Sequence, residues 1–177
     1  TTVDERYNNI YKYINYMNTV ITKMDKATGD ELKKAPLVAE ARVVRAWLHF
    51  LATVIHAPQY DASTAETDGG IAYVTSTDVS EQKVKLSLAA TFQMILDDCN
   101  DEVISLLPQD RGDQFMRGDR AWGNAVRAMV LFQMKRYSEA LPYAQEAIRL
   151  RPHIFDRSII KETGEWLQGA ESANNFL

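Results

Sequence analysis

One apolar segment constrains the fold of this chain more than any other feature. It spans residues 35–55 and reads APLVAEARVVRAWLHFLATVI. Its apolar residues recur at steps of three and four and also cover most of the remaining surface, which predicts an α-helix buried on nearly all sides. His49 and several charged residues interrupt the segment, whereas a membrane span needs ~20 apolar residues in a row. Because Pro36 fits a first helical turn and Pro58 lies three residues past Ile55, we expect this helix to occupy 35–55 and to form the centre of a helical core.

Four other segments have helical spacing, and the short connections between some of them make consecutive helices antiparallel. Asp4 is a suitable N-cap for the first of these helices. The predicted helices besides the central one are 4–24, 87–107 (with 91 as an alternative start), 120–134 and 138–150. We therefore predict a single all-α domain over 1–177, built from antiparallel helix pairs with tetratricopeptide-repeat-like packing.

The last two predicted helices carry the spacing of one tetratricopeptide repeat at 120–152. The turn aromatic, the small helix-contact residues and the terminating proline of that pattern are Tyr137, Ala140, Ala144, Ala147 and Pro152. Small side chains let two helices approach closely, so we expect the three alanines to face the helix at 120–134. The helix at 120–134 itself matches the pattern poorly, and we therefore interpret 120–152 as a degenerate repeat.

Composition and the titratable residues argue against several classes of function. A net charge of −4 provides no basic field for phosphates, so we expect no nucleic-acid partner. Cys99 is the only cysteine and lies in a helical pattern, which is typical of a packing residue. His49 and His56 lie two helical turns apart and cannot chelate one metal, and Asp97 and Asp101 are best explained as a solvated helix face. We expect no catalytic residue, no metal, no cofactor and no enzymatic activity.

A long stretch without helical spacing, 57–86, is the natural place to look for a binding site. Connections longer than about a dozen residues without secondary structure are usually functional or mobile. Tyr60 and Tyr73 lie in this loop, and Trp166 lies in the irregular tail after residue 152. Aromatic rings outside helices can stack on sugars, although packing is the alternative for each, and a tyrosine-rich face of the helix at 4–24 has the same two interpretations.

Five pieces of the sequence, taken in order, resemble the SusD/RagB family of surface-exposed nutrient-binding lipoproteins of Bacteroidetes. They are YNNIYKYINYMNTVI, EARVVRAWLHFLATVIHAPQY, DGGIAYVT, ILDDCNDEVISLLP and WGNAVRAMVLFQMKRYSEALPYAQEAI. Two departures concern the loop: Ala72 and Tyr73 stand where the family has Pro-Leu, and His56-Ala57-Pro58 replaces an aromatic-Gly turn. The conformation of the family's loop therefore cannot be transferred to this chain.

The resemblance implies a function, a location and partners. It implies a non-enzymatic protein that binds a nutrient, most simply a glycan, together with a SusC-like TonB-dependent transporter at the cell outer membrane. Ligand would be held by loop aromatics, for which Tyr60, Tyr73 and Trp166 are the candidates. Because family members are much longer, the resemblance also implies that this chain is the helical portion of a larger protein, whose lipid anchor lies outside it. The alternative is a helical-repeat scaffold that binds a peptide or protein partner.

Overall fold

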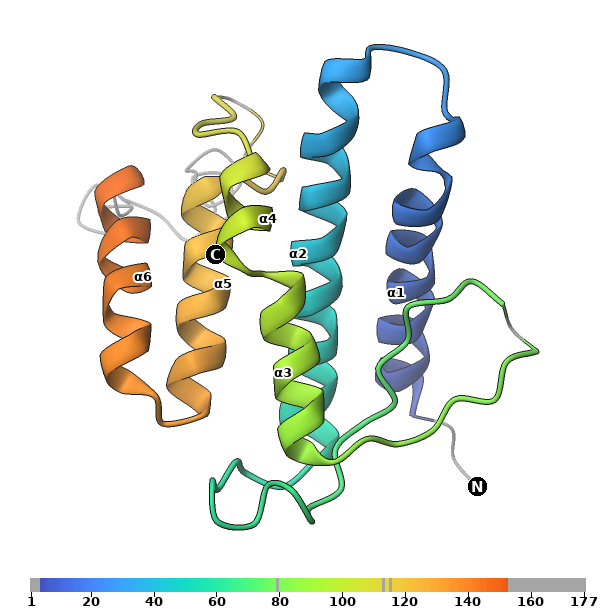
Figure 1. Cartoon of the computed structure of the whole chain (residues 1–177), viewed down its shortest axis with the longest axis vertical. Helices are drawn as coiled ribbons and strands as arrows, with labels where there is room; N and C mark the ends of the chain where they lie inside the picture. The colour runs from blue at the N-terminus through green and yellow to red at the C-terminus, as the bar shows by residue number, and fades with distance from the viewer. Residues whose placement is uncertain (1–3, 79, 113, 115, 153–177) are drawn as a thin grey trace, which may run out of the picture.

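The computed structural model describes residues 4–78, 80–112, 114 and 116–152, and this part of the chain is helical, with one isolated β-bridge. The all-α prediction is confirmed. The helices are α1 (Glu5–Lys23), the 3-10 turn η1 (Met24–Lys26), α2 (Glu31–His56), α3 (Leu88–Asp98), α4 (Asp101–Leu106), α5 (Arg120–Gln133) and α6 (Tyr137–Leu150). Figure 1 shows α1 beside α2, α3 and α4 along another side of α2, and the α5–α6 hairpin beyond them.

The first hairpin pairs α1 with α2, and α2 begins one turn earlier than expected. Asp4 caps α1 by accepting the Arg6 N–H at 2.9 Å, as predicted. Asp30 caps α2 in the same way through the Leu32 N–H at 3.0 Å. Pro36 therefore lies inside the helix and not in its first turn. The fixed φ of proline is compatible with a helix, so the cap at Asp30 decides where α2 starts, at the loss of one backbone hydrogen bond.

The helix expected at 87–107 is broken in two. The Asn100 side chain accepts the Val103 N–H at 2.9 Å and starts α4 as a separate helix. Leu106, the last residue of α4, is exposed. Asp98, the last residue of α3, is buried. An asparagine side chain that bonds the backbone locally competes with a continuous helix, and periodicity alone does not reveal this.

The core is centred on α2 and contains residues from every later helix. Val43, Ala46 and Phe50 of α2 meet Phe92 and Ile95 of α3, and α4, α5 and α6 extend the same cluster. Trp47 and Trp122 pack against its edge. Burying large side chains of this kind contributes about 1.5–3 kcal/mol each, which explains why the apolar segment organises the whole chain.

Cys99 is part of this core. Its side chain is fully buried and its thiol donates to the Ile95 carbonyl at 3.2 Å. Burial raises the pKa of the Cys99 thiol to about 12, so the side chain stays protonated at neutral pH. The expected packing role fits these surroundings.

Candidate functional site

Within the connection between α2 and α3, residues 57–87, two backbone hydrogen bonds hold residues 70–71 next to residue 86. The Gly70 N–H donates to the Leu86 carbonyl at 2.9 Å, and the Leu86 N–H donates to the Ile71 carbonyl at 3.1 Å. A Cβ atom at Gly70 would lie 2.2 Å from Thr91 Oγ1, so only glycine allows this close approach to α3. Between these contacts, residues 72–78 pass beside α1 and residues 80–85 lead back to the start of α3 (Figure 1).

Side chains of α1 and α2 hold the inner limb of this loop, residues 72–76. The Tyr11 hydroxyl donates to the Ala72 carbonyl at 2.9 Å. The Asn18 amide donates to the carbonyls of Val74 at 3.0 Å and Ser76 at 3.3 Å. Asn18 is fully buried, so the loop supplies partners that its amide needs in the interior.

His49 completes this set of contacts from α2. Its Nε2 accepts the Val74 N–H at 3.0 Å, and its Nδ1 lies 2.9 Å from the Arg45 carbonyl. These two partners require the neutral tautomer with the proton on Nδ1. Burial, together with the nearby Arg45 charge, lowers the pKa of His49 to about 4 although Asp98 opposes the shift. His49 is therefore a structural acceptor for the loop.

Asp98 is the centre of a buried polar network beneath the same loop. It accepts from Arg45 Nε at 2.6 Å and Nη2 at 2.8 Å, and from Arg42 Nε at 3.1 Å. Arg45 also donates to Asn18 Oδ1 at 2.8 Å. Burial by itself would raise the pKa of Asp98, but the hydrogen bonds and charge of Arg45 outweigh it and hold that pKa below its usual value. The carboxylate stays ionised and links α2 to α3.

The three residues predicted to bind ligand have different surroundings. Tyr73 points inward: its hydroxyl donates to Asp98 Oδ2 at 2.6 Å and its ring stacks on His49 with centroids 3.8 Å apart. Tyr60 is partly buried and meets Phe92 edge to face at 5.1 Å. Trp166 lies outside the described residues. Tyr60 and Tyr73 thus contact different residues, and the binding role of all three residues stays a prediction.

Sequence reasoning missed Asp98 and Asn18, which organise the loop. A signal was present, because Arg42 and Arg45 lie one turn apart on the helix that its apolar spacing predicts to be buried on nearly all sides. A buried arginine needs a carboxylate partner, so these residues indicated that an acidic side chain would be buried nearby. The sequence did not show that Asp98, and not its neighbour Asp97, would be that partner.

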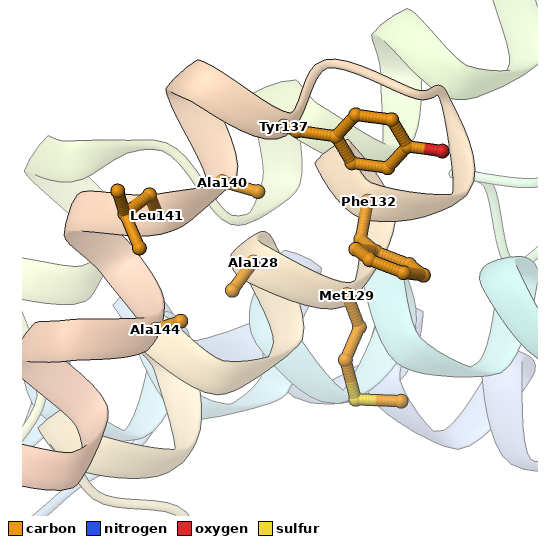
Figure 2. Close-up of a pocket in the computed structure, with 7 residues that line it drawn as sticks. All are labelled: Ala128, Met129, Phe132, Tyr137, Ala140, Leu141 and Ala144. Atoms are coloured by element: carbon orange, nitrogen blue, oxygen red, sulfur yellow. The ribbon is translucent and has the colours of Figure 1, made fainter.

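A groove between α5 and α6 is lined almost entirely by apolar groups. It has a volume of about 460 Å³, with three alanines at its floor and larger side chains around them. Figure 2 shows these residues: Ala128, Met129, Phe132, Tyr137, Ala140, Leu141 and Ala144. Phe132 is 63% exposed and Leu141 is 56% exposed, which is unusual for side chains of this size.

A second hollow, of about 470 Å³, lies between the first turns of α2 and the segment 108–117. It is lined by Leu32, Lys33, Pro36, Leu37, Pro108, Arg111, Gln114 and Arg117. Glu40 holds the two arginines, accepting from Arg111 Nη2 at 2.7 Å and from Arg117 Nε and Nη2 at 2.8 and 2.7 Å. Burial would raise the pKa of Glu40, but Arg117, the Gly118 N–H and Arg111 together keep that pKa low.

Metal ligands and membrane spans can be assessed for the described residues. Within residues 4–152, apart from 79, 113 and 115, we find no group of three or more histidine, cysteine, aspartate or glutamate side chains arranged to hold a metal ion. None of the helices in the same part of the chain is both long and apolar enough to cross a membrane.

Comparison with solved structures finds the same fold in proteins of Bacteroides. A SusD-like carbohydrate-binding protein from Bacteroides vulgatus matches 86% of this chain with a TM-score of 0.75 and 16% identity. A SusD superfamily protein from Bacteroides thetaiotaomicron matches 81% with a TM-score of 0.71 and 22% identity. Surface glycan-binding protein A from Bacteroides uniformis matches 93% with a TM-score of 0.70 and 20% identity.

The chain spans only about a third of these structures, namely 32%, 31% and 36% of their lengths. No protein of curated function matches it. The family described as SusD-like, starch-binding and associating with the outer membrane matches residues 1–126, which is most of the chain. The resemblance found in the sequence is therefore confirmed, and the chain belongs to the SusD-like family.

Proposed function

We propose that this chain is the helical part of a non-enzymatic protein that binds an oligosaccharide nutrient. In this proposal the protein lies at the surface of the outer membrane and works with a SusC-like TonB-dependent transporter. The observation that carries the proposal is the match of residues 1–126 to a family described as starch-binding and associating with the outer membrane. The names of two structural neighbours, a laminarin-binding SusD-like protein and a surface glycan-binding protein, support a glycan as the class of ligand.

The buried carboxylates support a binding role over a hydrolytic one. A glycosidase needs a carboxylic acid whose pKa is raised so that it can protonate the leaving group. The described residues include three buried carboxylates, namely Asp119, which caps α5, and Asp98 and Glu40. Arginine partners hold the pKa values of Asp98 and Glu40 below their usual values. Both act as structural anions that link segments distant in sequence.

The proposal is tested by measuring affinity for neutral oligosaccharides after alanine substitution at Tyr60 and Trp166. We expect each to weaken binding by ~1–2 kcal/mol if its ring stacks on the sugar, as interface anchors typically do. Tyr73→Ala should instead lower the melting temperature, because it removes the hydroxyl that donates to Asp98 and the ring that stacks on His49.

Ile148→Ala is the control, because Ile148 is an exposed apolar residue of α6 that lines neither hollow. Its substitution should change neither affinity nor melting. The glycan should be recovered intact after incubation with the protein. Failure of the protein to bind any neutral oligosaccharide, or cleavage of a bound one, would contradict the proposal. Loss of stability at Tyr60 and Trp166 with affinity unchanged would show that these rings serve packing.

A second candidate function is a helical scaffold for a protein partner, and the groove between α5 and α6 favours it. The lining contains almost no hydrogen-bonding groups, which a sugar would require, whereas its alanine floor would let the ridge of another helix approach closely. Charges beside the groove are paired with each other, as in Arg136–Glu139 and Glu146–Arg149. An amphipathic helix with an uncharged apolar stripe is the partner that fits this surface.

A further inference from the structure

The hollow beside the start of α2 is lined by three cationic side chains together with apolar ones. Lys33, Arg111 and Arg117 line it, and the carboxylates that pair with them are Glu40 and Asp30, the latter at 3.6 Å from Lys33. The three lining cations therefore share two carboxylate partners in the described part of the chain. The first turn of α2 lies at the same place, and the positive end of its helix dipole adds to their positive potential.

The two arginines are held in place with donors to spare. Arg111 uses Nε on the Gly118 carbonyl at 3.1 Å and Nη2 on Glu40, while Arg117 uses Nε and Nη2 on Glu40. Within the described chain, Nη1 of each guanidinium donates to no protein acceptor. A guanidinium whose orientation is fixed loses little entropy when it binds a further carboxylate or sulfate. The Glu40 carboxylate thus holds both arginine side chains in position.

Half of the lining residues are apolar. They are Leu32, Pro36 and Leu37 of α2 and Pro108, and Leu32 is 87% exposed. The apolar face of a sugar ring can pack against such side chains, while the Gln114 amide can reach its hydroxyl groups. The hollow therefore fits a ligand with one anionic group and one apolar face better than it fits a free inorganic ion.

We propose that this hollow is a binding site for an acidic saccharide, a sugar that carries a carboxylate or sulfate group. The site lies at the other end of α2 from the loop that contains Tyr60 and Tyr73. The proposal rests on the glycan-binding function proposed above and adds a charged class of sugar at a second place. The arginines held by Glu40 bind the anionic group, Lys33 contributes at the rim, and the apolar side chains contact the ring.

Isothermal titration calorimetry of the whole chain with trigalacturonate tests the proposal. Galactotriose serves as the neutral counterpart, and sodium sulfate as the anion without a sugar. We expect trigalacturonate to bind and to weaken as salt is added, because exposed charges are screened. Lys33→Gln should weaken it about fivefold and Arg117→Gln about tenfold or more, since an exposed charge contributes less than a guanidinium fixed by hydrogen bonds.

Lys85→Gln is the control, because it removes one exposed lysine from the distant 57–87 loop and should leave affinity unchanged. Lys33 is largely exposed, so its substitution tests the site even if Arg117→Gln does not fold. Sulfate binding as tight as trigalacturonate would show an adventitious ion only and overturn the proposal. Equal binding of trigalacturonate and galactotriose, or equal losses in the Lys33 and Lys85 variants, would also overturn it. Binding of neutral oligosaccharides, lost on Tyr60→Ala, would still support the function proposed above.

Discussion

At the scale of single residues, His49 makes the stability of this protein depend on pH. The folded protein keeps His49 neutral with a pKa of about 4, whereas the ordinary value is 6.5. The folded state therefore resists protonation of His49. The stability that neutral His49 contributes is fully present above pH 6.5 and is lost as the pH falls from 6.5 towards 4. The shift corresponds to about 3 kcal/mol of unfolding free energy. Urea denaturation measured at a series of pH values checks this prediction.

His49→Gln provides the comparison for this experiment. Glutamine does not titrate, and its amide oxygen can still accept the Val74 N–H that His49 Nε2 accepts in the wild type. We expect the variant to lose much less stability than the wild type over the same pH range. If the curves of stability against pH were parallel for the two proteins, His49 would not be the cause of this acid sensitivity. The cause would then be carboxylates whose pKa values are lowered, such as Glu40 and Asp98.

At the scale of helices, two alanines of α6 that line the groove to α5 differ in how deeply they are buried. Both alanines line the groove, but Ala140 is only 6% exposed, whereas Ala144 is partly exposed. Replacing Ala140 with leucine should overpack the contact with α5 and cost ~1–3 kcal/mol. Ala144→Leu should cost less, because the larger side chain can extend into the groove. Chemical denaturation of the two variants measures the difference, and equal costs would show that the groove is closed in solution.

At the scale of the whole molecule, the groove gives one face of the helical body an apolar surface. We expect a hydrophobic dye to bind this face, and the double variant Phe132→Gln/Leu141→Gln to lose most of that binding. Both side chains are exposed, so the double variant should change stability by no more than about 1 kcal/mol. Dye fluorescence and thermal unfolding measured together check the prediction.

Val84→Gln is the control for the dye experiment. Val84 is an exposed apolar residue of the 57–87 loop, away from α5 and α6. Its substitution should leave dye binding unchanged. If the double variant bound as much dye as the wild type, the α5–α6 face would not be the apolar surface that a partner helix could use.

The sequence by itself determined the helices, their order and the family. Apolar spacing and capping residues act locally, which is why α1, α5 and α6 lie within one residue of their expected ends. It also showed that the segment at 35–55 would form the centre of the core. Local competition explains the errors: Asp30 starts α2 before Pro36, and Asn100 divides the helix expected at 87–107.

Only the tertiary structure decided which polar residues meet. Asn18, His49 and Asp98 lie on three different helices, and they come together with Tyr73 because those helices pack around a shared interior. The pairing of Glu40 with Arg111 and Arg117 likewise joins residues more than seventy positions apart. Such contacts depend on how side chains far apart in the chain satisfy each other once buried, whereas periodicity reports only on neighbours within a helix.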